Sequence, residues 1–263
     1  MKSILRDIHW LTLLSGTVGA LLRFCLLLEG TDNKGLYPSG HFSWVLLIIF
    51  TRVVLVFLFL TTRHAGRSRQ YLANFPASWS GALGFLLGAA ALLWIGLQGL
   101  GQQDLLLRIK SILAIPTAAG LLLAAWSRFR GEKIHYLLYL LPCAFFALNL
   151  FCMGRQYGAE PEASRFLFAY FASAAIVVAF YLLWGYAVDL GNRALSLFFS
   201  LSAVYLCMVA APGREDALLY VGIGACLFLN LCPRQVAQRR KTTFVPEEEA
   251  ESTALANQDP QEE

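Results

Sequence analysis

Long apolar runs alternate with short polar segments from about residue 9 to about residue 232. Each run is close to 20 residues, the length of α-helix that crosses the roughly 30 Å hydrocarbon core of a bilayer. The runs do not alternate apolar and polar residues as membrane β-strands do. The pattern therefore predicts an all-α, polytopic transmembrane helical bundle of about eight spans. The expected helices are 9–28, 43–62, 79–97, 109–126, 136–153, 166–189, 194–211 and 217–232.

The composition supports the same class of protein. Of the 263 residues, 57% are hydrophobic and only 14% are charged, whereas ordinary soluble domains contain about 25% charged residues. A soluble fold could not cover its surface with so few polar side chains.

Basic residues are distributed unevenly between the expected loops. With the N-terminus inside, the inner segments hold 13 Lys and Arg residues and the outer segments hold six. Short cytoplasmic loops carry this kind of excess. We therefore expect both termini to be cytoplasmic, and the short loops favour the plasma membrane of a bacterium.

The C-terminal region divides the chain into two expected parts. Residues 1–241 form the transmembrane domain, and residues 242–263, acidic and poor in apolar residues, form a disordered cytoplasmic tail. The basic cluster before the tail is expected to contact anionic lipid headgroups at about 1 kcal/mol per residue. No feature indicates nucleic-acid binding, so the expected partner is the lipid bilayer. The cluster consists of Arg234, Arg239, Arg240 and Lys241.

Two arginines lie inside the first two apolar runs, and the rest of the chain is expected to pack around this helix pair. Arg23 is near the outer end of its run and can reach the interface, whereas Arg52 is near the middle. A mid-bilayer arginine costs about 2.5–3.5 kcal/mol on insertion scales, so Arg52 should face the protein interior. The carbonyls freed by Pro116 and Pro142 are candidate acceptors for its guanidinium.

The alternative is that the arginines receive an anionic substrate. The candidate substrate-binding residues are then Arg23, Arg52, Glu29 and Asn149. The loop after the first helix adds a polar patch that could bind a cation or titrate near neutral pH, although exposed loops commonly look like this. The patch contains Asp32, Lys34 and His41.

Small residues predict close packing of the third and fourth helices. Gly84 and Gly88 have the GxxxG spacing that allows two helices to approach closely. The expected helix 109–126 presents Ala114, Ala118 and Gly120 in return.

Three classes of function remain open. A transporter or permease would have a water-accessible cavity reaching Arg52, whereas a sensor, scaffold or partner subunit would hold Arg52 in a dry bundle. An intramembrane enzyme, the least supported class, would have a groove open to lipid near Glu29 and His41. The sequence contains no phosphate-binding loop, GxSxG, HExxH or CxxC motif, so neither a cofactor nor a metal is expected.

Overall fold

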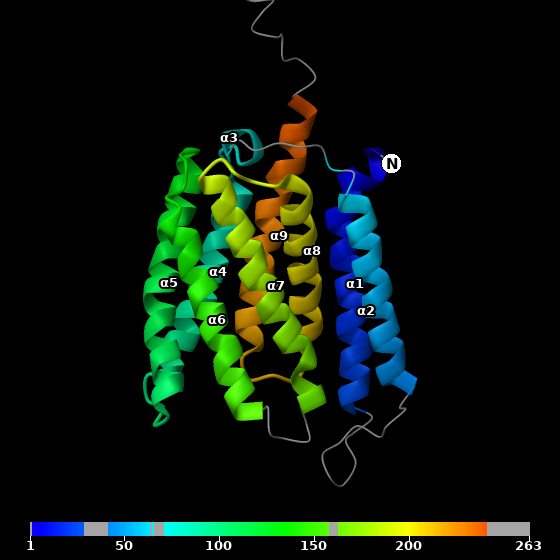
Figure 1. The fold of residues 1–263 in the computed structure, drawn as a ribbon, viewed down its shortest axis with the longest axis vertical. Coiled ribbons are helices and arrows are strands. Elements are labelled where there is room, and N and C mark those ends of the chain that lie inside the picture. Colours follow the sequence, from blue (N-terminus) through cyan, green and yellow to red (C-terminus); the bar gives the residue numbers. More distant parts are fainter. Residues whose placement is uncertain (1, 29–41, 64, 66–70, 158–162, 241–263) are drawn as a thin grey trace, which may run out of the picture.

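The computed structural model describes residues 2–28, 42–63, 65, 71–157 and 163–240. Within these residues the structure is all-helical, with eight long helices and one short helix, α3 (Figure 1). The helices are α1 (Lys2–Leu28), α2 (Phe42–Thr62), α3 (Tyr71–Asn74), α4 (Trp79–Gly99), α5 (Leu105–Arg130), α6 (Leu137–Tyr157), α7 (Ala163–Ala187), α8 (Arg193–Ala210) and α9 (Ala217–Arg240). The all-α prediction is confirmed, and each long helix overlaps its expected range. Several helices extend further, whereas α7 and α8 end slightly earlier than expected.

Short polar side chains determine where three helices begin. The side-chain oxygens of Ser78, Asp104 and Asn192 accept hydrogen bonds from the first free backbone N–H groups of α4, α5 and α8, which is the usual role of an N-cap residue. Gly131 ends α5 with φ 75°, a left-handed conformation that glycine adopts without strain.

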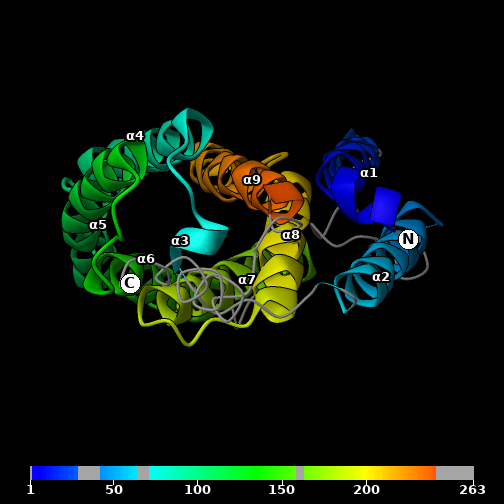
Figure 2. The same cartoon turned by 90° about the horizontal axis from the view of Figure 1, so that it is seen from above.

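Six helices form a closed ring. In chain order α4, α5, α6, α7, α8 and α9 each pack against the next, and α9 packs against α4 (Figure 2). The short helix α3 lies in one mouth of this ring (Figure 2). We call that mouth the α3 end, and the opposite mouth, formed by the α4–α5 and α8–α9 connections, the cavity end.

The helix pair α1 and α2 lies outside the ring, against α8. The expectation that the rest of the chain packs around this pair is therefore wrong. The ring formed by α4–α9 is the centre of the molecule, and α1 and α2 are attached to it through the largely buried helix α8.

Helix α4 is sandwiched between α5 and α9, which corrects part of the glycine prediction. A Cβ on Gly84 would lie 3.0 Å from the carbonyl oxygen of Cys226 in α9, whereas Gly96 faces Ser111 in α5. The close packing of α4 and α5 is confirmed by their extensive contact, but Gly84 serves the contact between α4 and α9.

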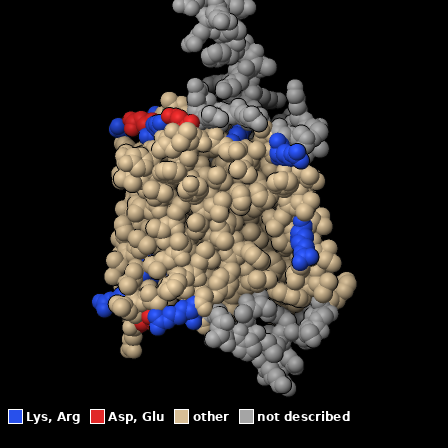
Figure 3. All heavy atoms as spheres, in the orientation of Figure 1, with Lys and Arg blue, Asp and Glu red and all other residues tan. Residues whose placement is uncertain are grey.

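Seven of the long helices are long and apolar enough to cross a membrane, and the apolar part of α9, Ala217–Leu231, is shorter. Charged side chains gather at the two ends of the visible surface, and the band between them is nearly uncharged (Figure 3). The fold is thus an apolar helical bundle that is consistent with a membrane protein. The count of eight spans and the orientation of the termini stay predictions.

Candidate functional site

A cavity of about 400 Å³ opens at the cavity end of the ring. Its walls come from α4, α5, α6, α7 and the α8–α9 connection, so the ring closure itself creates it. Many lining side chains are polar, although most of the surrounding helix surface is apolar. They include Gln98, Gln102, Lys110, Ser111, Asn149 and Gln156, together with Arg214, Glu215 and Asp216.

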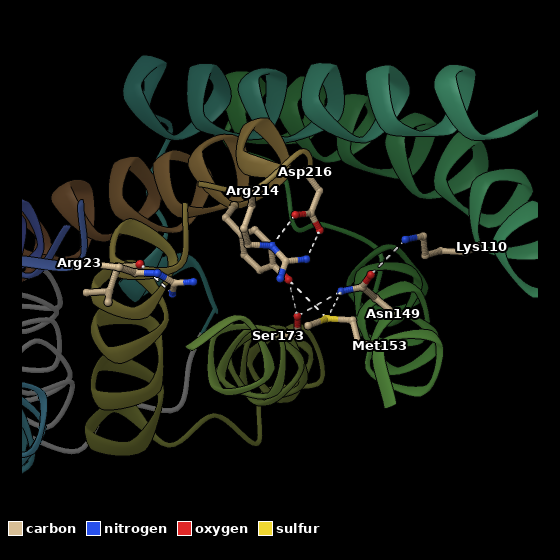
Figure 4. A network of polar contacts seen from close by, with 9 residues as sticks. Arg23, Lys110, Asn149, Met153, Ser173, Arg214 and Asp216 are labelled. Atoms are coloured by element: carbon tan, nitrogen blue, oxygen red, sulfur yellow. Dashed lines mark hydrogen bonds and ion pairs between the residues drawn. The ribbon is translucent and has the colours of Figure 1, made fainter. Parts of the chain in front are cut away.

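A chain of hydrogen bonds runs from the cavity wall into the buried interior of the ring and links four helices. Lys110 Nζ donates to Asn149 Oδ1 at 3.3 Å, and Asn149 Nδ2 donates to Ser173 Oγ at 3.2 Å. Ser173 Oγ is 3.1 Å from the hydroxyl of Tyr220. Because an ammonium can only donate, it fixes the amide of Asn149 with its NH₂ group toward Ser173. Figure 4 shows these groups meeting inside the ring.

An ion pair forms another part of the wall. Arg214 Nε and Nη2 donate to the two carboxylate oxygens of Asp216 at 2.5 and 2.9 Å. The guanidinium carbon lies 5.4 Å from the ring centroid of Phe166 and 5.6 Å from that of Tyr220. This bidentate, aromatic-flanked geometry is the one in which arginine is held most rigidly, so its charge has a fixed position.

Lys110 has no such ionic partner. Among the described residues no carboxylate lies within ion-pair distance of its ammonium, and its hydrogen-bond acceptor is the neutral amide of Asn149. The carboxylate of Asp216 is bound by Arg214. Lys110 is therefore a lining cation with no ion pair among the described residues, although Glu215 and Asp216 both line the same cavity.

The α3 end of the ring is closed by aromatic side chains around a buried arginine. Tyr71 and Phe75 of the α3 segment are each 1% exposed, and Tyr139 from α6 is equally buried. Arg128 of α5 is also 1% exposed, and its guanidinium carbon lies 4.9 Å from the centroid of Phe75. A cation over an aromatic face is favourable in such a desolvated place, so Arg128 fixes α3 in the mouth.

Asp189 tethers α3 from outside. Its Oδ1 accepts from the backbone N–H of Tyr71 at 3.1 Å, and its Oδ2 accepts from Lys133 Nζ at 2.5 Å. The hydrogen bond from Lys133 and then that from Tyr71 hold the pKa of the Asp189 carboxyl below its usual value. Asp189 has φ 58°, a left-handed conformation just after α7 ends at Ala187, so the chain cannot continue as a helix through this residue.

Of the predicted substrate-binding residues, Asn149 lies in the cavity wall, and Arg23 does not. Arg23 is 4% exposed and donates from Nη1 to the carbonyl oxygen of Val209 at 3.1 Å. Figure 4 shows it apart from the cavity network. Arg23 has a protein partner here because the last carbonyls of α8 lack helical partners and attract a cation. The expectation that Arg23 reaches the interface stays a prediction.

Arg52 is exposed on the outside of α2. The expectation that it faces the interior is therefore wrong, and the cavity does not reach it. Its neighbour Thr51 takes the inward position and forms a 2.9 Å hydrogen bond with Tyr205. The carbonyls near Pro116 and Pro142 are not acceptors for either arginine in the described contacts, so that proposal fails too.

The remaining predicted residues cannot be placed. Glu29, Asp32, Lys34, His41, Lys241 and the tail lie outside the described residues. The backbone of Arg234, Arg239 and Arg240 belongs to the last turns of α9, whereas their side chains lie outside the description. The expected headgroup contact of this cluster stays a prediction.

The sequence analysis missed Lys110, Arg214 and Asp216 as site residues. Each is at or near the end of an apolar run, where charged residues are ordinary. One signal could have found them. Lys110 lies about one turn inside its helix, and the connection with Arg214 and Asp216 is expected on the same side of the membrane. Only the ring closure brings the two together.

Comparison with known protein families, with curated proteins and with solved structures found no match. The fold itself, an apolar helical bundle with a polar cavity inside a six-helix ring, is therefore the basis for any functional conclusion.

Proposed function

We propose that this protein is a membrane transporter for a small organic anion that binds in the ring cavity beside Lys110. The observation that carries the proposal is the lysine ammonium in a cavity with two lining carboxylates, of which Asp216 is bound by Arg214 and neither forms an ion pair with Lys110 among the described residues. This keeps the anionic substrate inferred from the sequence and moves its site from Arg52 to the ring.

The chemistry of the wall favours a carboxylate-bearing solute. An ammonium, a guanidinium and the amides of Gln98 and Gln156 can all donate hydrogen bonds to it. Charge-assisted hydrogen bonds of this kind are about twice as strong as neutral ones. The volume of about 400 Å³ is at the small end of the range for ligand pockets, so the solute is small.

The two ends of the ring support transport rather than binding alone. The cavity end is open, whereas the α3 end is closed by Arg128, Phe75 and the tyrosines around them. A transporter exposes its site to one side at a time, which requires one closed and one open end. By the distribution of basic residues the cavity end faces outward, and release inward requires α3 to leave its mouth.

Thermal unfolding of the purified protein in detergent tests the binding step. A panel of carboxylates, amino acids, phosphate and halides is added to the parent, to Lys110→Gln and to Arg108→Gln. Arg108 is the matched control because it is exposed on the same helix and does not line the cavity. A solute at 100 times its dissociation constant adds about 2.7 kcal/mol of stability.

We expect one or more carboxylates to stabilise the parent and Arg108→Gln but not Lys110→Gln. Uptake of that radiolabelled solute into proteoliposomes then tests transport, with counterflow as a second readout. If no anion stabilises the parent, or if Lys110→Gln responds as the parent does, the anion site is wrong. Binding without uptake would identify a sensor.

A further inference from the structure

Arg52 occupies the most costly position available to a charged side chain in this fold. It is ten residues from each end of α2 (Phe42–Thr62), which places its Cα about 15 Å from either end at 1.5 Å per residue. An arginine side chain is much shorter than that distance and cannot bring its charge to the aqueous phase. Yet Arg52 is exposed on the outside of the bundle, where lipid would surround it.

The residues in line with Arg52 form a continuous exposed stripe. Going along α2, they recur at steps of four, three, four and three, which is the spacing with which one helix packs along another. The opposite side of the helix, with Leu47, Thr51 and Leu58, is buried. The α2 stripe consists of Val45, Ile49, Arg52, Val56 and Phe59, all of which are exposed.

The described part of the chain has no carboxylate that could neutralise Arg52. Its acidic residues all lie in connections or within the first turns of a helix, far from the centre of any span. They are Asp7, Asp104, Glu132, Asp189, Glu215 and Asp216.

We infer that the α2 stripe is the docking surface for a transmembrane helix of another protein, and that this helix carries an Asp or Glu at mid-membrane beside Arg52. A charge inside a membrane is retained where an opposite charge or a polar partner compensates it. The stripe supplies apolar contacts on both sides of the arginine, so the partner helix can pack along its whole length.

A second copy of this chain does not fit the same surface. A symmetric pair formed through α2 would bring the two Arg52 side chains together, and like charges repel strongly in a medium of low dielectric constant. Charge complementarity therefore selects a different protein. This inference does not rest on the proposed transport function, because the α2 stripe lies outside the ring and the cavity does not include it.

The test measures association with a synthetic probe helix in lipid vesicles. The probe is a Leu/Ala helix of about 20 residues, enough to span the bilayer, with Asp, Leu or Lys at its centre. The full-length protein carries a donor fluorophore at its C-terminus, the probe carries an acceptor, and energy transfer gives the apparent affinity. The variants are Arg52→Gln, Arg52→Glu and, as a control that removes a charge from the end of the same helix, Arg63→Gln.

We expect the Asp probe to bind the parent and Arg63→Gln about tenfold more tightly than the Leu probe, the size expected for a polar contact between membrane helices. Arg52→Gln should lose this preference, and Arg52→Glu should prefer the Lys probe. Thermal unfolding of each variant confirms that it is folded. If the single substitutions weaken binding of the Asp probe, binding of the Lys probe to Arg52→Glu shows that the interaction is restored with the charges exchanged.

Equal binding of the Asp and Leu probes to the folded parent would overturn the inference. So would an Asp preference that survives in Arg52→Gln. Energy transfer between two labelled copies of the parent that disappears in Arg52→Gln would show self-association through this surface instead and would also overturn it.

Discussion

Two arginines in neighbouring apolar helices have opposite environments. Arg23 is buried and donates a hydrogen bond to the carbonyl of Val209 near the C-terminal end of α8, whereas Arg52 is exposed on the outside of α2. Each is the single charge in its apolar run. From their positions along the helices, the sequence pattern predicts that Arg52 faces the interior and that Arg23 reaches the membrane surface. What separates them is the face of the helix: Arg23 is on the side of α1 that contacts α8, and Thr51 rather than Arg52 is on the corresponding side of α2.

Replacement of Arg23 should therefore be more destabilising than replacement of Arg52. Arg23→Gln leaves the Val209 carbonyl without its charged donor, and a buried unsatisfied group costs about 1–3 kcal/mol. Arg52→Gln removes a charge that the described residues do not compensate and should change stability by less than about 0.5 kcal/mol. Thermal unfolding of both variants in the same detergent measures the difference, and equal losses would contradict this assignment.

The Asp189 tether predicts a pH dependence. Because the pKa of Asp189 is lowered in the folded protein, its contribution is complete above the usual aspartate pKa near 4 and is lost as the pH falls through the lower, folded value. Asp189 and Lys133 are about half exposed, so solvent screening limits the contribution to about 0.2–1 kcal/mol.

In Asp189→Asn the unfolding temperature should fall less between pH 7 and pH 3 than in the parent. Asparagine tolerates the left-handed φ of 58° and can still accept from the backbone of Tyr71. Asp189→Ala removes both hydrogen bonds and strains the backbone, so it should lose stability at every pH. Unfolding temperatures from pH 3 to pH 7 distinguish the two variants, and a fall in Asp189→Asn as large as in the parent would exclude the tether.

At the scale of the elements, α4 packs closely against both α5 and α9, and each contact uses a different glycine of α4. Its face toward α9 has Gly84 against the backbone of Cys226, and its face toward α5 has Gly96 against Ser111. The GxxxG spacing signals close approach of some helix, but it does not say which one. The helix that comes closest to Gly84 is 142 residues away along the chain (226 − 84).

Gly84→Ala should destabilise the contact between α4 and α9 by about 1–3 kcal/mol. The added Cβ would lie 3.0 Å from a backbone oxygen, which cannot move as a side chain can, and overpacking costs this amount. Gly154→Ala is the control, because that exposed position in α6 has nothing within 4 Å.

At Gly154 alanine should be neutral or raise stability by up to about 1 kcal/mol, as expected for a helix interior. Thermal unfolding of the two variants beside the parent measures both effects. A loss in Gly154→Ala as large as in Gly84→Ala would show that close approach is not the cause.

At the scale of the whole molecule, the ring produces a site that no single element contains. The cavity needs Lys110 from α5, Asn149 from α6, and Arg214 and Asp216 from the connection that closes the ring through α9. The α3 segment closes the other mouth. A ring with one open and one closed mouth therefore exists only when all six helices are in place, and α1 and α2 lie outside it.

Labelling from the two sides of the membrane tests how the ring is oriented. In a background without the six native cysteines, Gln102→Cys is at the cavity end and Glu132→Cys is at the α3 end, and both positions are exposed. The excess of basic residues predicts that the α3 end faces the cytoplasm. An impermeant maleimide added to intact cells should label Gln102→Cys alone, whereas labelling of Glu132→Cys alone would reverse the orientation.

The sequence by itself determined the all-helical class and the approximate positions of the long apolar helices. Hydrophobic length and composition settle these, because a bilayer imposes one span length on every helix. Asn149 was also recognised as a polar group inside an apolar run.

Only the tertiary structure decided which face of each helix is buried and which residues meet. In a membrane both the lipid-facing and the protein-facing sides of a helix are apolar, so the periodicity that identifies the buried face in soluble proteins is weak. For that reason Arg52 could not be placed outside, α3 could not be recognised as a closure, and Lys110 could not be joined to Arg214 until the ring was closed.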